Sequence, residues 1–228
     1  MKRLLLLTPL LTTLAFPASA QTILSLTASG SATAAPDEAV AQLEIQATKP
    51  KAADAQAEVN QAVAKALSAA RALKSLTVTT GSYNTYTVTA DRQTAPEFTA
   101  EQSLTLVQPA AGGVPDAAFG ELLAKLQSEG LLLTGLTGDL SIAGQQKRQA
   151  EAVQNALANL RTEAASIAST LHKKVGALQS LTVDTAGGYA PPMGARVMAL
   201  AAASPQSAPS DLSTTARITA KIELDPAQ

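Results

Sequence analysis

The sequence predicts an α+β fold in which a largely antiparallel sheet is packed by two or three helices. Segments with alternating apolar and polar residues, typical of strands, come in consecutive pairs instead of alternating regularly with helices. Three longer segments carry apolar residues at spacings of three and four, which place them on one face of a helix. The expected order is strand, strand, helix, strand, strand, helix, strand, helix, strand, strand.

The first two expected strands, residues 24–30 and 38–48, organise the rest of the chain. Between them stand Pro36, which cannot donate a ladder hydrogen bond, and Asp37, whose side chain can bond the nearby backbone. We expect Pro36 and Asp37 to form a hinge between two strands that pair with each other. The alternative is that Asp37 and Glu38 form half of a catalytic acid pair.

Three amphipathic helices are expected. The first covers residues 52–73, and a short second one begins at Asp116 as N-cap and ends at Gly130. The third covers residues 145–174, with Lys173 and Lys174 complementing its C-terminal dipole and Gly176 ending it. Its predicted apolar stripe consists of Val153, Leu157, Leu160, Ala164, Ile167 and Leu171. Polar residues cover its other faces, so this helix is expected to lie on a surface.

The remaining strands are rich in Thr, Val and Leu, and are expected over residues 76–89, 98–108, 131–142, 177–185 and 213–224. The first two of these predict a hairpin. Tyr83 and Tyr86 near its far end, with Phe98, belong either to the packed core of the hairpin or to a small aromatic contact surface. Gly135 and Gly138 weaken their strand or mark bulges.

Residues 186–211 are dominated by Gly, Ala, Pro and Ser. A loop of that length is unusual inside a compact domain. We therefore expect a flexible low-complexity loop, which is either disordered in part or serves as an interaction element.

Residues 1–20 have the pattern of a secretory signal peptide. Lys2 and Arg3 precede an apolar run that closes at the small residues Ala18, Ser19 and Ala20. We expect cleavage after Ala20, which leaves residues 21–228 as one exported domain that is periplasmic or secreted. A retained membrane anchor is the alternative, although the apolar run is short for a bilayer and no later segment is apolar enough to span one.

Charge and composition exclude several classes of function. The full chain has a formal net charge of −1, with 17 basic and 18 acidic side chains, which is too weak to select a nucleic acid partner. Cysteine is absent and His172 is the single histidine, so ordinary zinc or copper sites are nearly excluded and no cofactor is expected. His172 itself is expected to be a solvated residue at a helix end.

No catalytic constellation stands out, so we expect a protein that is not an enzyme. Serines occur without the G-x-S-x-G pattern of a nucleophile elbow, and Gly112-Gly113 and Gly187-Gly188 lack the strand-to-helix context of a phosphate loop. The pairs Asp116 with Glu121 and Asp139 with Asp184 favour a surface interpretation over acid chemistry or calcium binding. The basic residues Lys147, Arg148 and Arg161 are expected on a solvated helix face.

Taken together, five features resemble the SIMPL-domain (DUF541) family. They are the G-x-x-x-x-x-P-D pattern from Gly30 to Asp37, the helix around Val59-Asn60, the stretch at residues 79–83, the strand at residues 103–106, and the Ala-rich helix after residue 145. The family consists of exported bacterial proteins and includes periplasmic immunogenic and oxidative-stress defence groups. The resemblance implies an α+β architecture, homo-oligomeric assembly and no established catalytic residues.

Three hypotheses for function follow. The first is a non-enzymatic cell-envelope protein that assembles with itself or binds an envelope partner, linked to envelope or oxidative stress. The second is a carrier that holds a small apolar molecule between sheet and helices, which requires a cavity of a few hundred Å³. The third is a hydrolase that uses Asp or Glu, which requires two carboxylates to converge in a cleft.

Overall fold

A computed structural model describes residues 21–88, 95–185 and 209–227 of the chain. Its elements are β1 (Thr22–Ala34), β2 (Glu38–Lys49), α1 (Ala52–Ala70), β3 (Thr77–Val88), β4 (Glu97–Pro109), η1 (Ala111–Gly113), α2 (Ala117–Ser128), β5 (Leu132–Asp139), α3 (Ile142–Thr170), β6 (Lys173–Asp184) and β7 (Leu212–Pro226). The helices and strands follow in the predicted order. The predicted α+β class is therefore confirmed.

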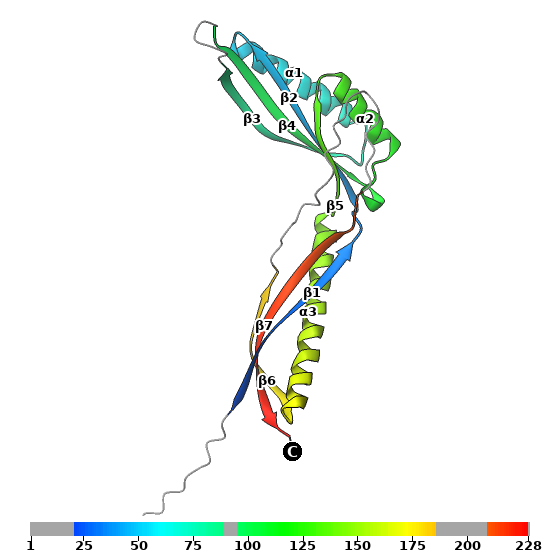
Figure 1. Cartoon of the computed structure of the whole chain (residues 1–228). Coiled ribbons are helices and arrows are strands. Elements are labelled where there is room, and N and C mark those ends of the chain that lie inside the picture. Colours follow the sequence, from blue (N-terminus) through cyan, green and yellow to red (C-terminus); the bar gives the residue numbers. More distant parts are fainter. Residues whose placement is uncertain (1–20, 89–94, 186–208, 228) are drawn as a thin grey trace, which may run out of the picture.

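The strands form two antiparallel sheets that lie end to end (Figure 1). The four-stranded lobe has the strand order β3-β4-β2-β5 and carries α1 and α2. The three-stranded lobe has the order β1-β7-β6 and carries α3. The expected signal peptide, residues 1–20, and most of the expected flexible loop, residues 186–208, lie outside the described residues.

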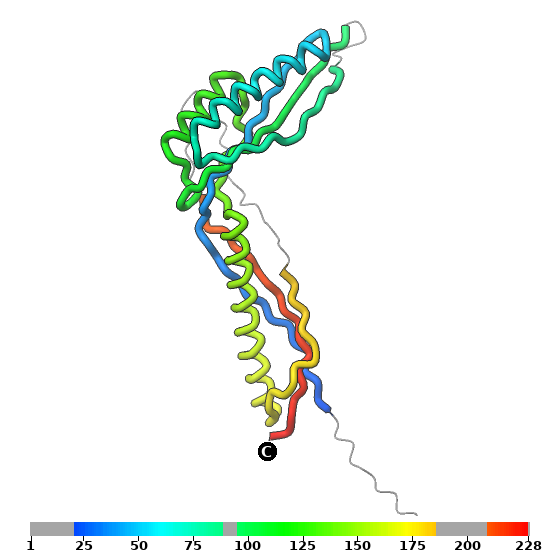
Figure 2. Tube along the Cα trace, turned by 180° about the vertical axis from the view of Figure 1, so that it is seen from behind, coloured from blue at the N-terminus to red at the C-terminus, as the bar shows by residue number. Residues whose placement is uncertain are grey.

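The predicted pairing of the first two strands with each other is wrong. β1 pairs with β7, whereas β2 pairs with β4 on one side and β5 on the other. The Pro36-Asp37 link keeps the chain extended, so that β2 continues out of β1 into the second sheet instead of folding back (Figure 2). One long extended segment therefore contributes a strand to each lobe.

The core of the four-stranded lobe lies between its sheet and the two short helices. α1 buries Ala55, Val59 and Val63 against the sheet, and α2 buries Phe119 and Leu123. The polar side chains in this layer are satisfied. Buried Gln108 donates to the Asp116 carboxylate over 2.8 Å, and the hydroxyls of Thr99 and Thr48 lie 2.8 Å apart.

The predicted hairpin is present as β3 and β4. Its register shifts between Thr80 and Tyr83, so the glycine at position 81 marks a bulge. Gly135 also sits beside an irregularity, because the pairing of β2 with β5 passes from Gly135 to Leu133 and skips Thr134. The Thr134 hydroxyl instead donates to the Gln42 carbonyl over 3.1 Å.

The long helix α3 begins and ends earlier than predicted. Ser141 is its N-cap and accepts a hydrogen bond from the Gly144 amide, so the preceding strand ends at Asp139. At the other end, His172 takes a left-handed φ of 51°, which turns the chain directly into β6. Lys173 and Lys174 therefore belong to a strand, and their predicted role at a helix C-terminus is wrong.

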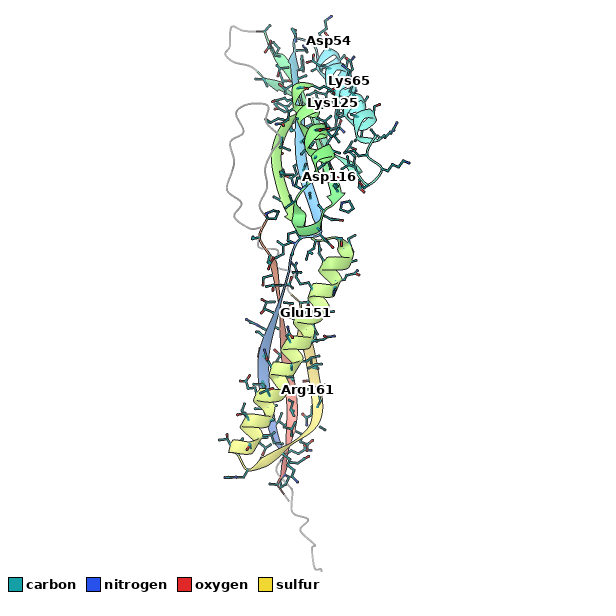
Figure 3. The ribbon with its side chains drawn as sticks, turned by 90° about the vertical axis from the view of Figure 1, so that its right-hand side faces the viewer. Asp54, Lys65, Asp116, Lys125, Glu151 and Arg161 are labelled. Atoms are coloured by element: carbon teal, nitrogen blue, oxygen red, sulfur yellow. The ribbon has the colours of Figure 1, made fainter. Side chains whose placement is uncertain are left out.

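α3 lies along the three-stranded sheet (Figure 3), and four of the five residues on its buried face are alanine. The buried residues are Ala152, Ala156, Leu160, Ala164 and Ala168. The predicted apolar stripe included larger side chains that lie beside the buried face. Val153, Leu157 and Ile167 are only half-buried, and Leu171 is exposed. Alanine has little side chain to hold a helix away from a sheet, so the helix and strand backbones approach each other.

The closest approach of α3 is to β1, the edge strand on one side of the sheet. A Cβ atom at Gly30 would lie 2.6 Å from the carbonyl carbon of Asn155 and 2.7 Å from the Ala152 oxygen. The amides of Asn155 and Asn159 donate to the Ser31 and Ser29 carbonyls, each over 2.8 Å. α3 thus leans over β1 and satisfies part of its free edge.

Asp37 joins the two lobes through its backbone and its side chain. Its amide donates to the Asp139 carbonyl over 2.9 Å and its carbonyl accepts from the Ala110 amide over 2.8 Å. Its carboxylate accepts from the Ser141 amide over 2.5 Å and from the Ser141 hydroxyl over 2.8 Å. The link between β1 and β2 is thereby tied to the N-terminus of α3.

Small residues surround this link. A Cβ atom at Gly113 would lie 2.7 Å from the Gly138 Cα and 2.8 Å from the Pro36 Cβ, and one at Gly138 would lie 2.6 Å from the Pro209 Cβ. The two glycines and two prolines thus pack tightly where η1, β5, the β1–β2 link and the approach to β7 meet. Gly138 is therefore required for packing, and Gly113 belongs to this packed junction.

We expect Asp37→Ala to lower the free energy of unfolding by about 2–3 kcal/mol, because two hydrogen bonds to a charged carboxylate are lost and the Ser141 donors lose their partner. Asp37→Asn should lose less, because the amide oxygen still accepts one bond. Urea denaturation measures both. Glu163→Ala, which removes an exposed carboxylate elsewhere on the helix, is the control, and an equal loss in that variant would contradict the assignment.

Gly30→Ala should destabilise the protein by about 1–3 kcal/mol, since the new methyl group overlaps the α3 backbone and forces the helix away from β1. Gly135→Ala is a matched control, because its Cβ would meet its nearest neighbour, the Gln42 Oε1 atom, at an ordinary 3.6 Å. Thermal or urea unfolding compares the two. Equal stability of both variants would show that the close approach of α3 is not needed.

Candidate functional site

The three aromatic residues of the hairpin do not form one surface. Tyr83 pairs across the ladder with Gln102, and Tyr86 pairs with Thr99, so the two tyrosines lie on opposite faces of the sheet. Phe98 shares the face of Tyr83. On the other face, the Tyr86 hydroxyl donates to the Glu101 carboxylate over 3.3 Å and accepts from the Gln46 amide over 3.2 Å. A contact surface formed by all three aromatic residues together is therefore excluded.

Three carboxylates lie close together at the junction of the lobes. Asp37 and Asp139 both raise the pKa of the neighbouring Glu38, although burial of the Glu38 carboxyl is the larger cause. Asp37 accepts from Ser141, and Asp139 accepts from the Leu140 amide over 2.7 Å. Two of the three carboxylates thus accept hydrogen bonds from Leu140 and Ser141, the residues that lead into α3, which is a structural task.

The other predicted acid pairs stay apart or act locally. Asp116 is the N-cap of α2, as predicted, and accepts from the Phe119 amide over 2.8 Å (Figure 3). This backbone hydrogen bond, helped by the Gln108 side chain, lowers the pKa of Asp116. Glu121 is exposed on the same helix, and Asp139 and Asp184 belong to different sheets. The Asp116 carboxylate is thus engaged in capping α2.

Within residues 21–88, 95–185 and 209–227, no group of three or more His, Cys, Asp or Glu side chains could hold a metal ion. His172 is exposed in the turn between α3 and β6. In the same described ranges, no helix is long and apolar enough to cross a membrane.

The basic residues of α3 differ in their surroundings. Lys147 and Arg161 are exposed, as predicted. Arg148 is half-buried, and its Nε and Nη1 atoms are shielded from solvent without a hydrogen-bond partner in the described part of the chain. The prediction of a fully solvated basic face is therefore wrong at Arg148.

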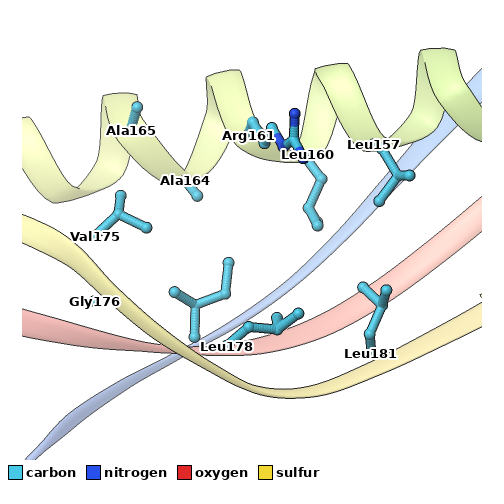
Figure 4. A pocket seen from close by; sticks show the side chains of 10 residues that line it. Leu157, Leu160, Arg161, Ala164, Ala165, Val175, Gly176, Leu178 and Leu181 are labelled. Atoms are coloured by element: carbon cyan, nitrogen blue, oxygen red, sulfur yellow. The ribbon is translucent and has the colours of Figure 1, made fainter.

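One feature suited to binding is an apolar groove between α3 and β6 (Figure 4). It has a volume of about 620 Å³, and small-molecule sites commonly fall between about 300 and 1,000 Å³. Leu157, Leu160 and Ala164 approach it from α3, and Val175, Leu178 and Leu181 approach it from β6. Arg161 is the one charged residue among those that line it. We call this feature the α3–β6 groove.

The groove exists because α3 covers the sheet unevenly. The inward positions of β6 pair with buried residues of β7: Leu178 opposes Ile222, and Val183 opposes Ile218. Those β7 residues lie beneath α3, but the helix leans towards β1 and leaves the matching side chains of β6 open. The exposed set is Val175, Leu178, Leu181 and Val183, which we call the β6 strip and which is 42–55% exposed.

The sequence predicted a pocket between sheet and helices as an alternative, but it did not indicate which residues line the groove. The strand was expected to begin at residue 177, so Val175 was not assigned to it. The irregular spacing of the β6 strip also conceals, in the sequence, that its side chains share one face. The register of β6 shifts on both sides of Leu178, so Val175, Leu178 and Leu181 fall three apart instead of two and still face one way. The sequence feature that pointed to the groove was the row of alanines on α3, whose neighbouring leucines flank the groove.

A family model described as "SIMPL: Protein of unknown function (DUF541)" matches residues 24–224. The match begins in β1 and ends in β7, so that it spans both lobes and the junction between them. No curated protein matches the chain.

The raised pKa of Glu38 makes stability depend on pH. Between its ordinary pKa of 4.5 and its higher folded-state value, the folded chain binds more protons than the unfolded chain, so the Glu38 contribution to stability falls as pH rises. We expect Glu38→Gln to remove this loss and to be more stable than the wild type at neutral pH. Urea denaturation at a series of pH values measures it, with Glu44→Gln on the same strand as control. An unchanged pH profile in Glu38→Gln would refute the assignment.

Proposed function

Because the chain belongs to the SIMPL family, we propose that it is an exported cell-envelope protein, periplasmic or secreted, that works without catalysis by assembling with copies of itself or binding an envelope partner. A role in defence against envelope or oxidative stress is part of this proposal. It rests on the resemblance to the stress-defence and immunogenic groups of the family.

The single observation that supports assembly is the exposed β6 strip on an edge strand. In the described part of the chain, β6 has a strand neighbour on one side only, so the backbone of its other side is free to pair. Four adjacent apolar side chains next to such an edge are typical of a surface that another protein covers. The opposite edge strand, β1, is partly satisfied by Asn155 and Asn159. The proposed assembly interface is therefore the free edge of β6 and not that of β1.

A second candidate function is supported by the α3–β6 groove. Its volume of about 620 Å³ meets the requirement for a carrier of a small apolar molecule between sheet and helix, and its walls are almost entirely aliphatic. In this function the groove is filled by a ligand and not by another protein chain. The two functions compete for the same side chains, so a filled groove and an assembled β6 strip are alternative states.

If the β6 strip carries assembly, Leu178→Asp and Leu181→Asp should each reduce the multimer to a monomer, because a carboxylate cannot be buried in an apolar interface without a partner. Light scattering at micromolar concentrations measures the mass. Both leucines are substantially exposed in the single chain, so circular dichroism should report an unchanged fold.

Ser29→Asp, on the polar face of the same sheet, is the matched control and should leave the multimer intact. A monomeric wild-type chain across this concentration range would count against self-assembly. Multimers that persist in both leucine variants would place the interface on another surface.

A further inference from the structure

The position of Arg161 narrows the kind of ligand that suits the α3–β6 groove. Its side chain lies on α3 beside Leu160, at the margin of the groove (Figure 4). Lys49 and Glu58 form an ion pair in the other lobe, but within the described residues no carboxylate lies within 4.0 Å of the Arg161 guanidinium. The groove thus combines aliphatic walls with one cation that has no protein counter-ion there.

We propose that the α3–β6 groove binds a free single-chain amphiphile with an anionic head group, such as a fatty acid. The aliphatic tail lies between Leu157 and Leu160 of α3 and Leu178 and Leu181 of β6. The head group accepts hydrogen bonds from the Arg161 guanidinium, whose planar fork matches a carboxylate. The proposal rests on the second proposed function, that the groove carries a ligand, and adds the chemical class of that ligand.

The charge and shape of the groove select this class over others. A purely apolar molecule would gain nothing from Arg161, and a cationic amphiphile would be repelled by it. The groove is open along the β6 strip, where Leu178 is 55% exposed, so a linear chain can enter sideways without a change in the fold. Arg161 stands four residues from each end of the helix wall, Leu157 and Ala165, so a tail that starts at Arg161 has about 6 Å of helix wall beside it, at about 1.5 Å per residue, and extends along the open β6 strip.

The test compares dodecanoate with its methyl ester, which keeps the tail and removes the charge, and with dodecyltrimethylammonium, which reverses it. Isothermal titration calorimetry measures binding to the chain, below the micelle concentration of the two ionic probes and below the solubility limit of the ester. We expect dodecanoate to bind one to one, at least fivefold more tightly than the ester, and the cation to bind most weakly. Arg161→Gln should reduce dodecanoate affinity to that of the ester and leave the ester unchanged.

Two further variants distinguish binding in the groove from non-specific binding to the protein surface. Leu178→Asp should abolish binding of both dodecanoate and ester, because it places a carboxylate inside the groove. Arg217→Gln, on the exposed face of β7 away from α3, is the matched control and should change neither affinity. Loss of binding in Arg217→Gln equal to that in Arg161→Gln would overturn the proposal.

The remaining outcomes distinguish the ligand class from the carrier function. Equal affinity for acid and ester, or an equal loss of both in Arg161→Gln, overturns the anionic class while the carrier function stands. No binding of any probe to a chain with a multimeric mass means that another copy covers the groove, and overturns both. Sedimentation with anionic vesicles without binding of free dodecanoate overturns the proposal in favour of a membrane surface.

Discussion

The hydrogen bonds from Ser141 to the Asp37 carboxylate are the constraint on which the arrangement of the two lobes depends. Asp37 follows the proline that separates β1 from β2, and Ser141 is the residue from which α3 starts. The same aspartate also bonds the ends of β5 and η1 through its backbone. One residue thus sets where one sheet ends, where the other begins and where the long helix starts. Close packing of Pro36, Gly113 and Gly138 leaves little room for the junction to bend.

The position of α3 explains both what the three-stranded lobe protects and what it leaves open. Alanines on the helix and Gly30 on β1 allow close contact at one edge, and Asn155 and Asn159 satisfy strand carbonyls there. A helix is only about 10 Å wide, so a helix centred over one edge cannot also cover the other. The exposed apolar side of β6 is therefore a direct consequence of the way β1 is covered.

This geometry brings the two proposed functions to one surface. An exposed aliphatic strip beside a free strand edge favours contact with another chain, and the same strip with the leucines of α3 forms a groove of the size that small ligands occupy. Occupation by a ligand would cover the side chains that assembly needs. The carboxylates that the sequence singled out have a different task, because Asp37, Asp116 and Asp139 all accept hydrogen bonds from backbone amides near helix starts.

The sequence by itself determined the α+β class, the order of the elements, the hairpin, the cap at Asp116 and the resemblance to the SIMPL family, because alternation, helical spacing and capping residues are local signals. Apart from the hairpin, only the tertiary structure decided which strands pair, since β1 meets β7 nearly two hundred positions away. It also decided the early turn at His172 and the shared face of Val175, Leu178 and Leu181, which bulges hide from a period of two. The groove depends on where α3 rests on the sheet, and that position follows from contacts between distant segments.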